Sequence, residues 1–532
     1  MNQKIKQIIQ NSFYQLLAIY TVLIVLISLN LFGKFSLQVS IFALLVAVFG
    51  IFTIKNEDPE KLDFPKGIHY SLFVLAILII LISRLIPYIG NNIPLGYDTG
   101  IYKYGIEHGL TNLDFWIRSG MEPGFLYLMK LFSFIFSTEF MLTYLLIGFC
   151  LLLGISVYLF TKEYFGKKAA IISLLVYSVS VIQFQTFWYM YYKNIIGLAL
   201  MLFSLFFLKK AQNSPKHWYR TAFIASAGLL GAIHRPTFYI FGLSYLFYSV
   251  FDSIKSKKLD FKTLKYHIIN GFFILLIFIS FYIGKFWSSL FVLSDVAQGF
   301  ISPGASSGTF INFFTYQYST LAYLPFAILG LFYLIKKKNF NILFFWAVIN
   351  ATIVYFQFFF FNRFIIMLDI PLIILASIGF CTIIENKKKF GTIILIIMLL
   401  SAGFVLINQS ITSKPLINQN ELSVIKYLNN TENNSFVMAT SSYYSPWLQG
   451  YSGRRVIAPG LFDYNTGNKS EWMNFWTTKN MTEVKNFLDP YGKPLYIFIG
   501  EKQEKNIVQF NSSGCFEIFF KQSDNTIYKY TC

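Results

Sequence analysis

Apolar residues fill most of the first 407 positions in long runs, and short polar or basic stretches separate these runs. A helix needs about 20 mostly apolar residues to cross the hydrocarbon core of a bilayer, so each long run predicts a membrane-spanning helix. We predict thirteen such helices, at approximately 12–32, 35–54, 69–89, 139–160, 168–187, 194–209, 221–233, 236–252, 267–287, 313–335, 340–360, 363–384 and 389–407.

One further apolar stretch, Met121–Phe136, is shorter than a full crossing requires. A crossing at this point would invert every later loop. We therefore expect an interfacial or re-entrant helix on the outer side of the membrane.

The pattern changes after about residue 407, where Asn-, Ser- and Tyr-rich stretches with alternating apolar positions begin. The segment "ELSVIKYLNN" predicts a helix, "YIFIG" a buried strand, and "CFEIFFKQSDNTIYKY" a hairpin. We expect a mixed α/β domain over residues 408–532. Cys515 and Cys532 lie in this domain, and the sequence leaves open whether they form a disulfide.

Composition excludes a soluble globular protein. The chain has 532 residues, of which 55% are hydrophobic and 13% charged, and its mean hydropathy is +0.54. The formal net charge of +19 raises the possibility of nucleic-acid binding. However, Lys and Arg concentrate in every second connection, which is the positive-inside pattern of a membrane protein. We therefore expect a multi-pass plasma-membrane protein with a cytoplasmic N-terminus, an extracytoplasmic tail and no nucleic-acid partner.

Polar residues of another kind gather on the predicted outer side. The first external loop, residues 90–138, carries four acids, and single basic groups occupy three separate tight turns. The loop groups are Asp98, Glu107, His108, Asp114 and Glu122, and the turn groups are Lys193, His234 with Arg235, and Arg363. Ionisable groups at a membrane edge are costly, so each is a candidate functional residue.

Cations that converge from several helices suit a phosphate, and an isolated carboxylate suits a general base. Nucleotide sugars are confined to the cytoplasm, so a phosphate-bearing donor outside it has to be linked to lipid. Each residue also has a structural alternative. Asp98 and Glu122 suit helix starts, Lys193 suits an interfacial anchor, and Arg363 suits an ion pair with Asp369.

The arrangement resembles the GT-C superfamily of membrane glycosyltransferases, which use polyprenyl-phosphate-linked sugars. The segments that carry the resemblance are "GYDTG", "YYKNIIGLALMLFSLFFLKKA", "AIHRPTF", "NRFIIMLDIPLIILASIGF" and "WLQGYSGRRVIAPG". They are most similar to the protein O-mannosyltransferase and lipid A aminoarabinose-transferase branch. The resemblance implies a GT-C-like membrane domain over residues 1–407 with about a dozen spans, followed by the exported α/β domain.

By this resemblance Asp98 is the base, and Lys193, His234, Arg235 and Arg363 contact the lipid phosphate. If the stretch after Asp98 is helical, Tyr102 shares its face and helps to orient the acid or the sugar. Many members carry a second acid beside the first, whereas Asp98 stands alone here, so we predict no metal and no other cofactor. The Trp-Trp-Asp-Tyr-Gly signature of oligosaccharyltransferases is also absent, which disfavours en bloc transfer to Asn.

The predicted function is transfer of a sugar from a polyprenyl-phosphate donor to a hydroxyl on a glycan, lipid or protein acceptor. One alternative is an exopolysaccharide-type polymerase, because "YDTGIYKYGI" and "EPGFLYLMKLF" are similar to that class; Glu122 and Arg235 would then be central. A second alternative is a transporter or flippase of lipid-linked sugars, although the sequence shows no convincing internal repeat.

Overall fold

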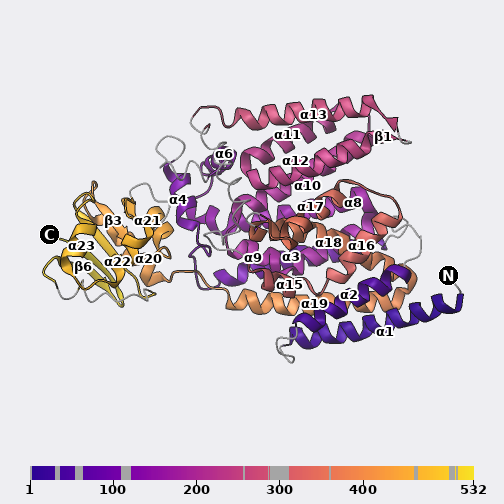
Figure 1. Ribbon diagram of the computed structural model, residues 1–532, viewed down its shortest axis with the longest axis horizontal. Helices are drawn as coiled ribbons and strands as arrows, with labels where there is room; N and C mark the ends of the chain where they lie inside the picture. Colours follow the sequence, from indigo (N-terminus) through magenta and orange to yellow (C-terminus); the bar gives the residue numbers. More distant parts are fainter. Residues whose placement is uncertain are drawn as a thin grey trace. The chain divides into compact units, whose positions relative to one another are not determined.

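The fold is described from a computed structural model and is mostly helical (Figure 1). The residues that the structure describes are 3–29, 36–53, 64–108, 121–255, 258–284, 287, 311–358, 361–459, 465–502, 510 and 513–532. Asp114, one of the predicted loop acids, lies outside them.

The chain divides into two compact units. Unit 1 comprises Met1–Ile89 and Leu146–Ser413, and unit 2 comprises Gly90–Leu145 and Lys414–Cys532. Residues 90–145, which include the first external loop that we assigned to the membrane domain, therefore group with the tail.

Unit 1 is a bundle of apolar helices. Its helices are α1 (Gln3–Ser28), α2 (Ser36–Thr53), α3 (Lys66–Leu85), α8 (Leu146–Val179), α9 (Val181–Trp188), α10 (Tyr192–Asn213), α11 (His217–Ile233), α12 (Arg235–Asp252), α13 (Phe261–Ser280), α15 (Phe313–Thr320), α16 (Leu324–Lys336), α17 (Ile342–Tyr355), α18 (Phe361–Asn386) and α19 (Lys388–Thr412). A 3-10 turn, Ile86–Tyr88, follows α3, and a short hairpin, β1 (Ile254–Lys255) and β2 (Lys258–Leu259), follows α12.

In the part of the chain that the structure describes, every predicted apolar run overlaps helix. Within the described residues, seven helices are long and apolar enough to cross a membrane, or up to eight if the bent pair α15 and α16 forms one span. A multi-pass membrane protein is therefore supported, while the number of thirteen crossings stays a prediction.

Three of the long helical segments in unit 1 are interrupted or kinked. Gly166 has φ +86°, a conformation that favours glycine, and joins two helices within α8. The pair α15 and α16 bends by 78°, and Pro371 lies inside α18. Pro371 has no N–H, so it leaves the carbonyl of Met367 without its helical donor. The Asn350 side-chain amide of α17 donates to this carbonyl at 3.2 Å and so replaces the hydrogen bond that the proline removes.

Unit 2 combines short helices with one sheet. Its elements are α4 (Thr99–His108), α6 (Pro123–Phe132), α7 (Thr138–Phe140), a π-helical turn (Met141–Leu145), α20 (Gln419–Tyr427), a 3-10 turn (Leu428–Asn430), β3 (Phe436–Ala439), α21 (Ser445–Tyr451), β4 (Arg455–Ile457), α22 (Lys469–Thr477), α23 (Met481–Leu488), β5 (Leu495–Ile499), β6 (Phe516–Gln522) and β7 (Asn525–Tyr530). At ten residues, α6 is too short to cross a bilayer, while its interfacial or re-entrant placement stays a prediction.

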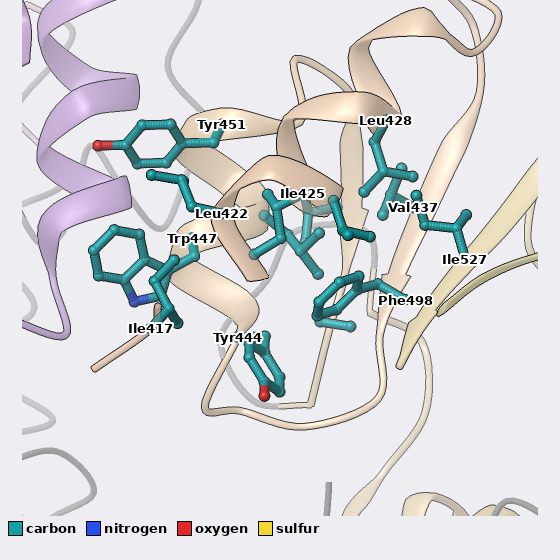
Figure 2. Packing of buried hydrophobic residues seen from close by; sticks show 14 of the residues in the cluster. Ile417, Leu422, Ile425, Leu428, Val437, Tyr444, Trp447, Tyr451, Phe498 and Ile527 are labelled. Atoms are coloured by element: carbon teal, nitrogen blue, oxygen red, sulfur yellow. The ribbon is translucent and has the colours of Figure 1, made fainter. Parts of the chain in front are cut away.

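The sheet has the order β4-β3-β5-β7-β6, with β3 parallel to β4 and β5, and with β7 antiparallel to β5 and β6. One apolar core packs α20 and α21 against the sheet (Figure 2), and a second packs α22 and α23 against it. The predicted helix, buried strand and hairpin are all present. Cys515 and Cys532 form a disulfide that closes the β6–β7 hairpin.

Candidate functional site

Asp98 lies directly before the first residue of α4, in unit 2. Its carbonyl accepts a hydrogen bond from the backbone N–H of Tyr102 at 3.0 Å, so Asp98 holds the N-cap position of the helix. Its side chain is half-buried. The neighbouring Tyr97 hydroxyl donates to the Ser442 carbonyl at 2.7 Å. Burial and then the Asp98 carboxylate raise the pKa of Tyr97 above its ordinary value.

A close crossing of α4 and α21 fixes the start of α4. A Cβ added to Gly100 would lie 1.7 Å from the Pro446 carbonyl oxygen, and one added to Gly450 would lie 2.4 Å from the Gly100 carbonyl oxygen. Only glycine allows backbones to approach this closely. Asp98 is two residues from this crossing, so the C-terminal part of unit 2 supports the candidate base.

Most other acids around Asp98 have basic partners. Lys103 forms ion pairs with Glu107 and, at 3.1 Å, with Glu139. Burial raises the pKa of Glu139, but Lys103, a backbone hydrogen bond and the charge of Lys426 together outweigh burial. The pKa of Glu139 therefore lies below its ordinary value. Glu107 therefore serves α4 as half of an i,i+4 pair.

Glu122 and Tyr102 are both buried within unit 2. Glu122 is only 2% exposed and holds the N-cap position of α6, with Pro123 at the first helical position. Tyr102 packs against Phe125 of α6, with 5.4 Å between ring centroids. His108 is exposed at the end of α4 and stacks on Tyr104, as expected of a solvated residue.

The predicted cations lie in unit 1, each in the first turn of a helix. Lys193 is the second residue of α10, Arg235 the first of α12, and Arg363 the third of α18. Lys193 and Arg235 are half-buried, and Arg363 is exposed. We call the end of unit 1 where these three helices begin the His234 end, after the residue that joins α11 to α12.

Contacts one turn into these helices bring the first turns together. A Cβ on Gly197, one turn after Lys193, would lie 2.9 Å from the His234 Cβ. The Thr237 hydroxyl of α12 lies 3.9 Å from the sulfur of Met367, one turn after Arg363. The predicted cations of α10, α12 and α18 therefore share one region of the His234 end.

His234 is 6% exposed and caps α12. Its Nδ1 accepts from the Thr237 backbone N–H at 3.4 Å and lies 2.7 Å from the Thr237 hydroxyl. An accepting Nδ1 carries no proton, so in the neutral ring the proton is on Nε2. His234 thus caps α12 through Nδ1, and its Nε2–H is a hydrogen-bond donor on the other side of the ring.

The cations stand where helix electrostatics disfavour them. A helix N-terminus carries partial positive charge, so a basic side chain in the first turn is repelled and an anion is attracted. Lysines also begin α3, α13 and α19, but at the opposite end of the bundle, where the topological bias towards basic residues accounts for them. The His234 end therefore combines three helix N-termini with three cations, an arrangement suited to a phosphate.

A buried polar network around Asp369 was not predicted. The Asp369 carboxylate accepts hydrogen bonds from the Ser180 hydroxyl and the Gln183 amide, both at 2.9 Å, and from the Tyr323 hydroxyl. These donors belong to the α8–α9 break and the α15–α16 bend, so the network ties the interrupted helices to α18. The predicted alternative pairing of Asp369 with Arg363 is not among the ion pairs of the described residues.

Arg84 is a second polar residue that sequence reasoning passed over, although an arginine inside a predicted span is itself a signal. It lies in the last turn of α3 and has no exposed surface. As for metals, within the described part of the chain no three His, Cys, Asp or Glu side chains are grouped to hold an ion. A metal-independent site stays a prediction.

Comparisons with known proteins agree with this architecture. The family model described as dolichyl-phosphate-mannose-protein mannosyltransferase matches residues 121–287. No curated protein matches the sequence.

Among solved structures, the apo oligosaccharyltransferase of Archaeoglobus fulgidus is similar with a TM-score of 0.63 and 14% identity, over 82% of this chain and 70% of that chain. AglB from the same organism, in complex with an inhibitory peptide and a dolichol-phosphate, is similar with a TM-score of 0.59 and 13% identity. The match covers 81% of this chain and 69% of that chain. ArnT from Cupriavidus metallidurans, bound to undecaprenyl phosphate, is similar with a TM-score of 0.59 and 10% identity. The match covers 88% of this chain and 98% of that chain.

The helical bundle and the small C-terminal sheet therefore share the fold of the oligosaccharyltransferase and of ArnT. The family model and these folds support the predicted resemblance to the GT-C superfamily.

Proposed function

We propose that this protein transfers a sugar from a polyprenyl-phosphate-linked donor to an acceptor hydroxyl on the extracytoplasmic face of the plasma membrane. The observation that carries the proposal is the cluster of Lys193, Arg235 and Arg363 in adjoining first turns of helices. Two similar proteins support the donor class, because ArnT is bound to undecaprenyl phosphate and AglB to a dolichol-phosphate.

In the proposed reaction, the acceptor oxygen attacks the anomeric carbon of the sugar, and the bond from that carbon to the phosphate oxygen breaks. The lipid phosphate leaves with the bonding electrons, and the cations stabilise the charge that develops on it. The Nε2–H of His234 supplies a further donor. Because the leaving group is a monophosphate, its charge is smaller than that of a pyrophosphate, and basic side chains suffice.

Asp98 takes the proton of the acceptor hydroxyl as the new bond forms. A single in-line displacement inverts the configuration at the anomeric carbon. Its half-buried side chain at the start of α4 retains access to solvent, as a base for an acceptor from the aqueous side requires. Tyr102 supports α4 by packing on α6.

The test compares sugar transfer from a labelled polyprenyl-phosphate donor pool into extracytoplasmic glycans for the wild type and Asp98→Asn, at matched membrane abundance. Asn caps a helix about as well as Asp, so this change removes the base but keeps the cap. Glu107→Gln, which removes another α4 acid, is the matched control.

We expect Asp98→Asn to lose transfer while donor binding persists, and Glu107→Gln to retain transfer. Unchanged transfer in Asp98→Asn contradicts the base assignment and gives priority to Glu122 and the polymerase alternative. Absence of transfer by the wild type contradicts the proposed reaction with this donor pool and favours a transporter.

A further inference from the structure

Arg84 combines complete burial with incomplete hydrogen bonding. Its Nη1 lies 3.4 Å from the Ile80 carbonyl and 3.2 Å from the Ser83 hydroxyl, both in its own helix. Its Nε and Nη2 have no hydrogen-bond partner among the described residues. A guanidinium is always charged and presents five N–H donors, so two nitrogens are left to bind something else.

The surroundings of Arg84 are nearly neutral. The guanidinium carbon lies 6.0 Å from the ring centroid of Tyr177 and 5.9 Å from that of Phe187, and the Cys150 thiol is within hydrogen-bonding reach. Among the described residues, no carboxylate forms an ion pair with Arg84. A buried charge without a partner is strongly unfavourable in a membrane bundle, so a ligand that neutralises it would be bound firmly.

An unpartnered acceptor lies on the helix that covers Arg84. Gln183 of α9 is one helical turn before Phe187; its Nε2 donates to Asp369, whereas its Oε1 has no partner among the described residues. Tyr177 interacts electrostatically with both Arg84 and Asp369, so these groups lie within one neighbourhood. The region therefore lacks acceptors for Arg84 and a donor for Gln183.

We infer that Arg84 and Gln183 form an intramembrane site for a phosphate group carried on a lipid. The phosphate oxygens accept from Nε and Nη2 of Arg84, and a hydroxyl of the attached group donates to Gln183 Oε1. Arg84 lies within the candidate membrane span Lys66–Tyr88, so a ligand carried on a lipid suits this site. The identity of the lipid as a polyprenyl phosphate rests on the proposed function; a phospholipid offers the same phosphate chemistry.

Thermal unfolding of the purified full-length protein in detergent tests the inference, because it reports ligand binding without requiring transfer. The variants are Arg84→Met, which removes the charge at similar length, and Arg84→Lys, which keeps the charge for folding. Arg220→Met is the control, since Arg220 has partners: its Nε donates to Asn270 at 2.7 Å and its guanidinium lies 4.8 Å from the Tyr266 ring centroid. Polyprenyl phosphate, phosphatidylglycerol and inorganic phosphate are the three probes.

The inference predicts an opposite response of the two arginines. Without ligand, Arg84→Met unfolds at the same temperature as the wild type or higher, because an unpartnered buried charge is gone, whereas Arg220→Met unfolds at a lower temperature. The rise in unfolding temperature that polyprenyl phosphate gives the wild type is smaller in Arg84→Met, because only the proposed cluster at the His234 end then holds the phosphate. Binding at the Arg84 site itself weakens at least about tenfold. The rise is reduced in Arg84→Lys and retained in Arg220→Met.

A rise in both Arg84 variants that is as large as in the wild type overturns the inference and leaves the proposed function intact. A rise that phosphatidylglycerol matches and that Arg84→Met removes supports the site but assigns it to phospholipid. The same result with inorganic phosphate alone overturns the lipid-borne ligand. If no probe shifts the wild type, both this site and the proposed donor class are contradicted.

Discussion

Arg235 and Arg363 give the most direct residue-scale test of the donor site. We expect Arg235→Gln and Arg363→Gln each to lower kcat/KM for the lipid-linked donor by about 10- to 100-fold, because a charge-assisted hydrogen bond contributes about 1.5–3 kcal/mol. Lys in either position recovers part of this loss, since it keeps the charge but not the bidentate geometry.

The matched control is Lys389→Gln, which removes a cation from the first turn of α19 at the opposite end of the bundle. Donor titrations with each variant check the prediction. Equal losses in Lys389→Gln and the Arg variants would mean that net charge, not the His234 end, governs activity.

The candidate site residues at the boundaries between apolar runs could be predicted from the sequence. His234 and Arg235 precede a proline between two apolar runs, and Arg363 begins a run, so the sequence itself marked them. The partners of Asp369 were not predictable, because Ser180 and Gln183 are 189 and 186 residues away. Arg84 escaped notice since the run around it reads as an ordinary span.

The kink in α18 provides a test at the scale of a single element. Asn350→Leu leaves the Met367 carbonyl buried without a donor, so the free energy of unfolding should fall by about 1–3 kcal/mol. In a Pro371→Ala background the backbone N–H is restored, and the same change should cost clearly less. Urea unfolding of the two single variants and the double variant measures this coupling. Additive changes in the free energy of unfolding would show that the Asn350 hydrogen bond does not compensate for the N–H missing at Pro371.

The α4–α21 crossing links element packing to the candidate base. A methyl group on Gly450 or Gly100 would overlap backbone atoms, so we expect Gly450→Ala and Gly100→Ala to lower the free energy of unfolding by about 1–3 kcal/mol and to lower kcat. Gly514→Ala is the control, because nothing lies within 4 Å of its added Cβ. Full activity in Gly450→Ala would separate the crossing from catalysis.

Element types followed from the sequence far better than element contacts did. Long apolar runs predicted the helices of unit 1, and alternating apolar positions around turn residues predicted the β6–β7 hairpin. By contrast, glycine pairing between α4 and α21 joins positions about 350 residues apart in the chain, and no local pattern encodes it.

At the scale of the whole molecule, the disulfide offers a test of which side of the membrane the C-terminal tail occupies. A structural disulfide persists in an oxidising compartment, so an extracytoplasmic tail predicts that Cys515 and Cys532 react with a thiol reagent only after reduction. Cys515→Ser should lower the stability of unit 2 by about 2–4 kcal/mol, because the bridge constrains the unfolded chain. Free thiols at both positions in intact membranes would contradict the predicted orientation.

The residues that we propose for the donor and acceptor chemistry occur in both units of the chain. Unit 1 carries Lys193, Arg235 and Arg363, and unit 2 carries Asp98. Fold similarity to ArnT extends over 98% of that chain, which supports the same general architecture.

The measurement that bears most directly on the central claim is release of free polyprenyl phosphate by the purified protein in liposomes supplied with polyprenyl-phosphate-linked sugars and an extract of cell-envelope acceptors. The account predicts release coupled one-to-one to sugar on the acceptor, abolished in Asp98→Asn and strongly reduced in Arg235→Gln. Movement of intact donor across the bilayer without release of polyprenyl phosphate would contradict the account and identify a transporter.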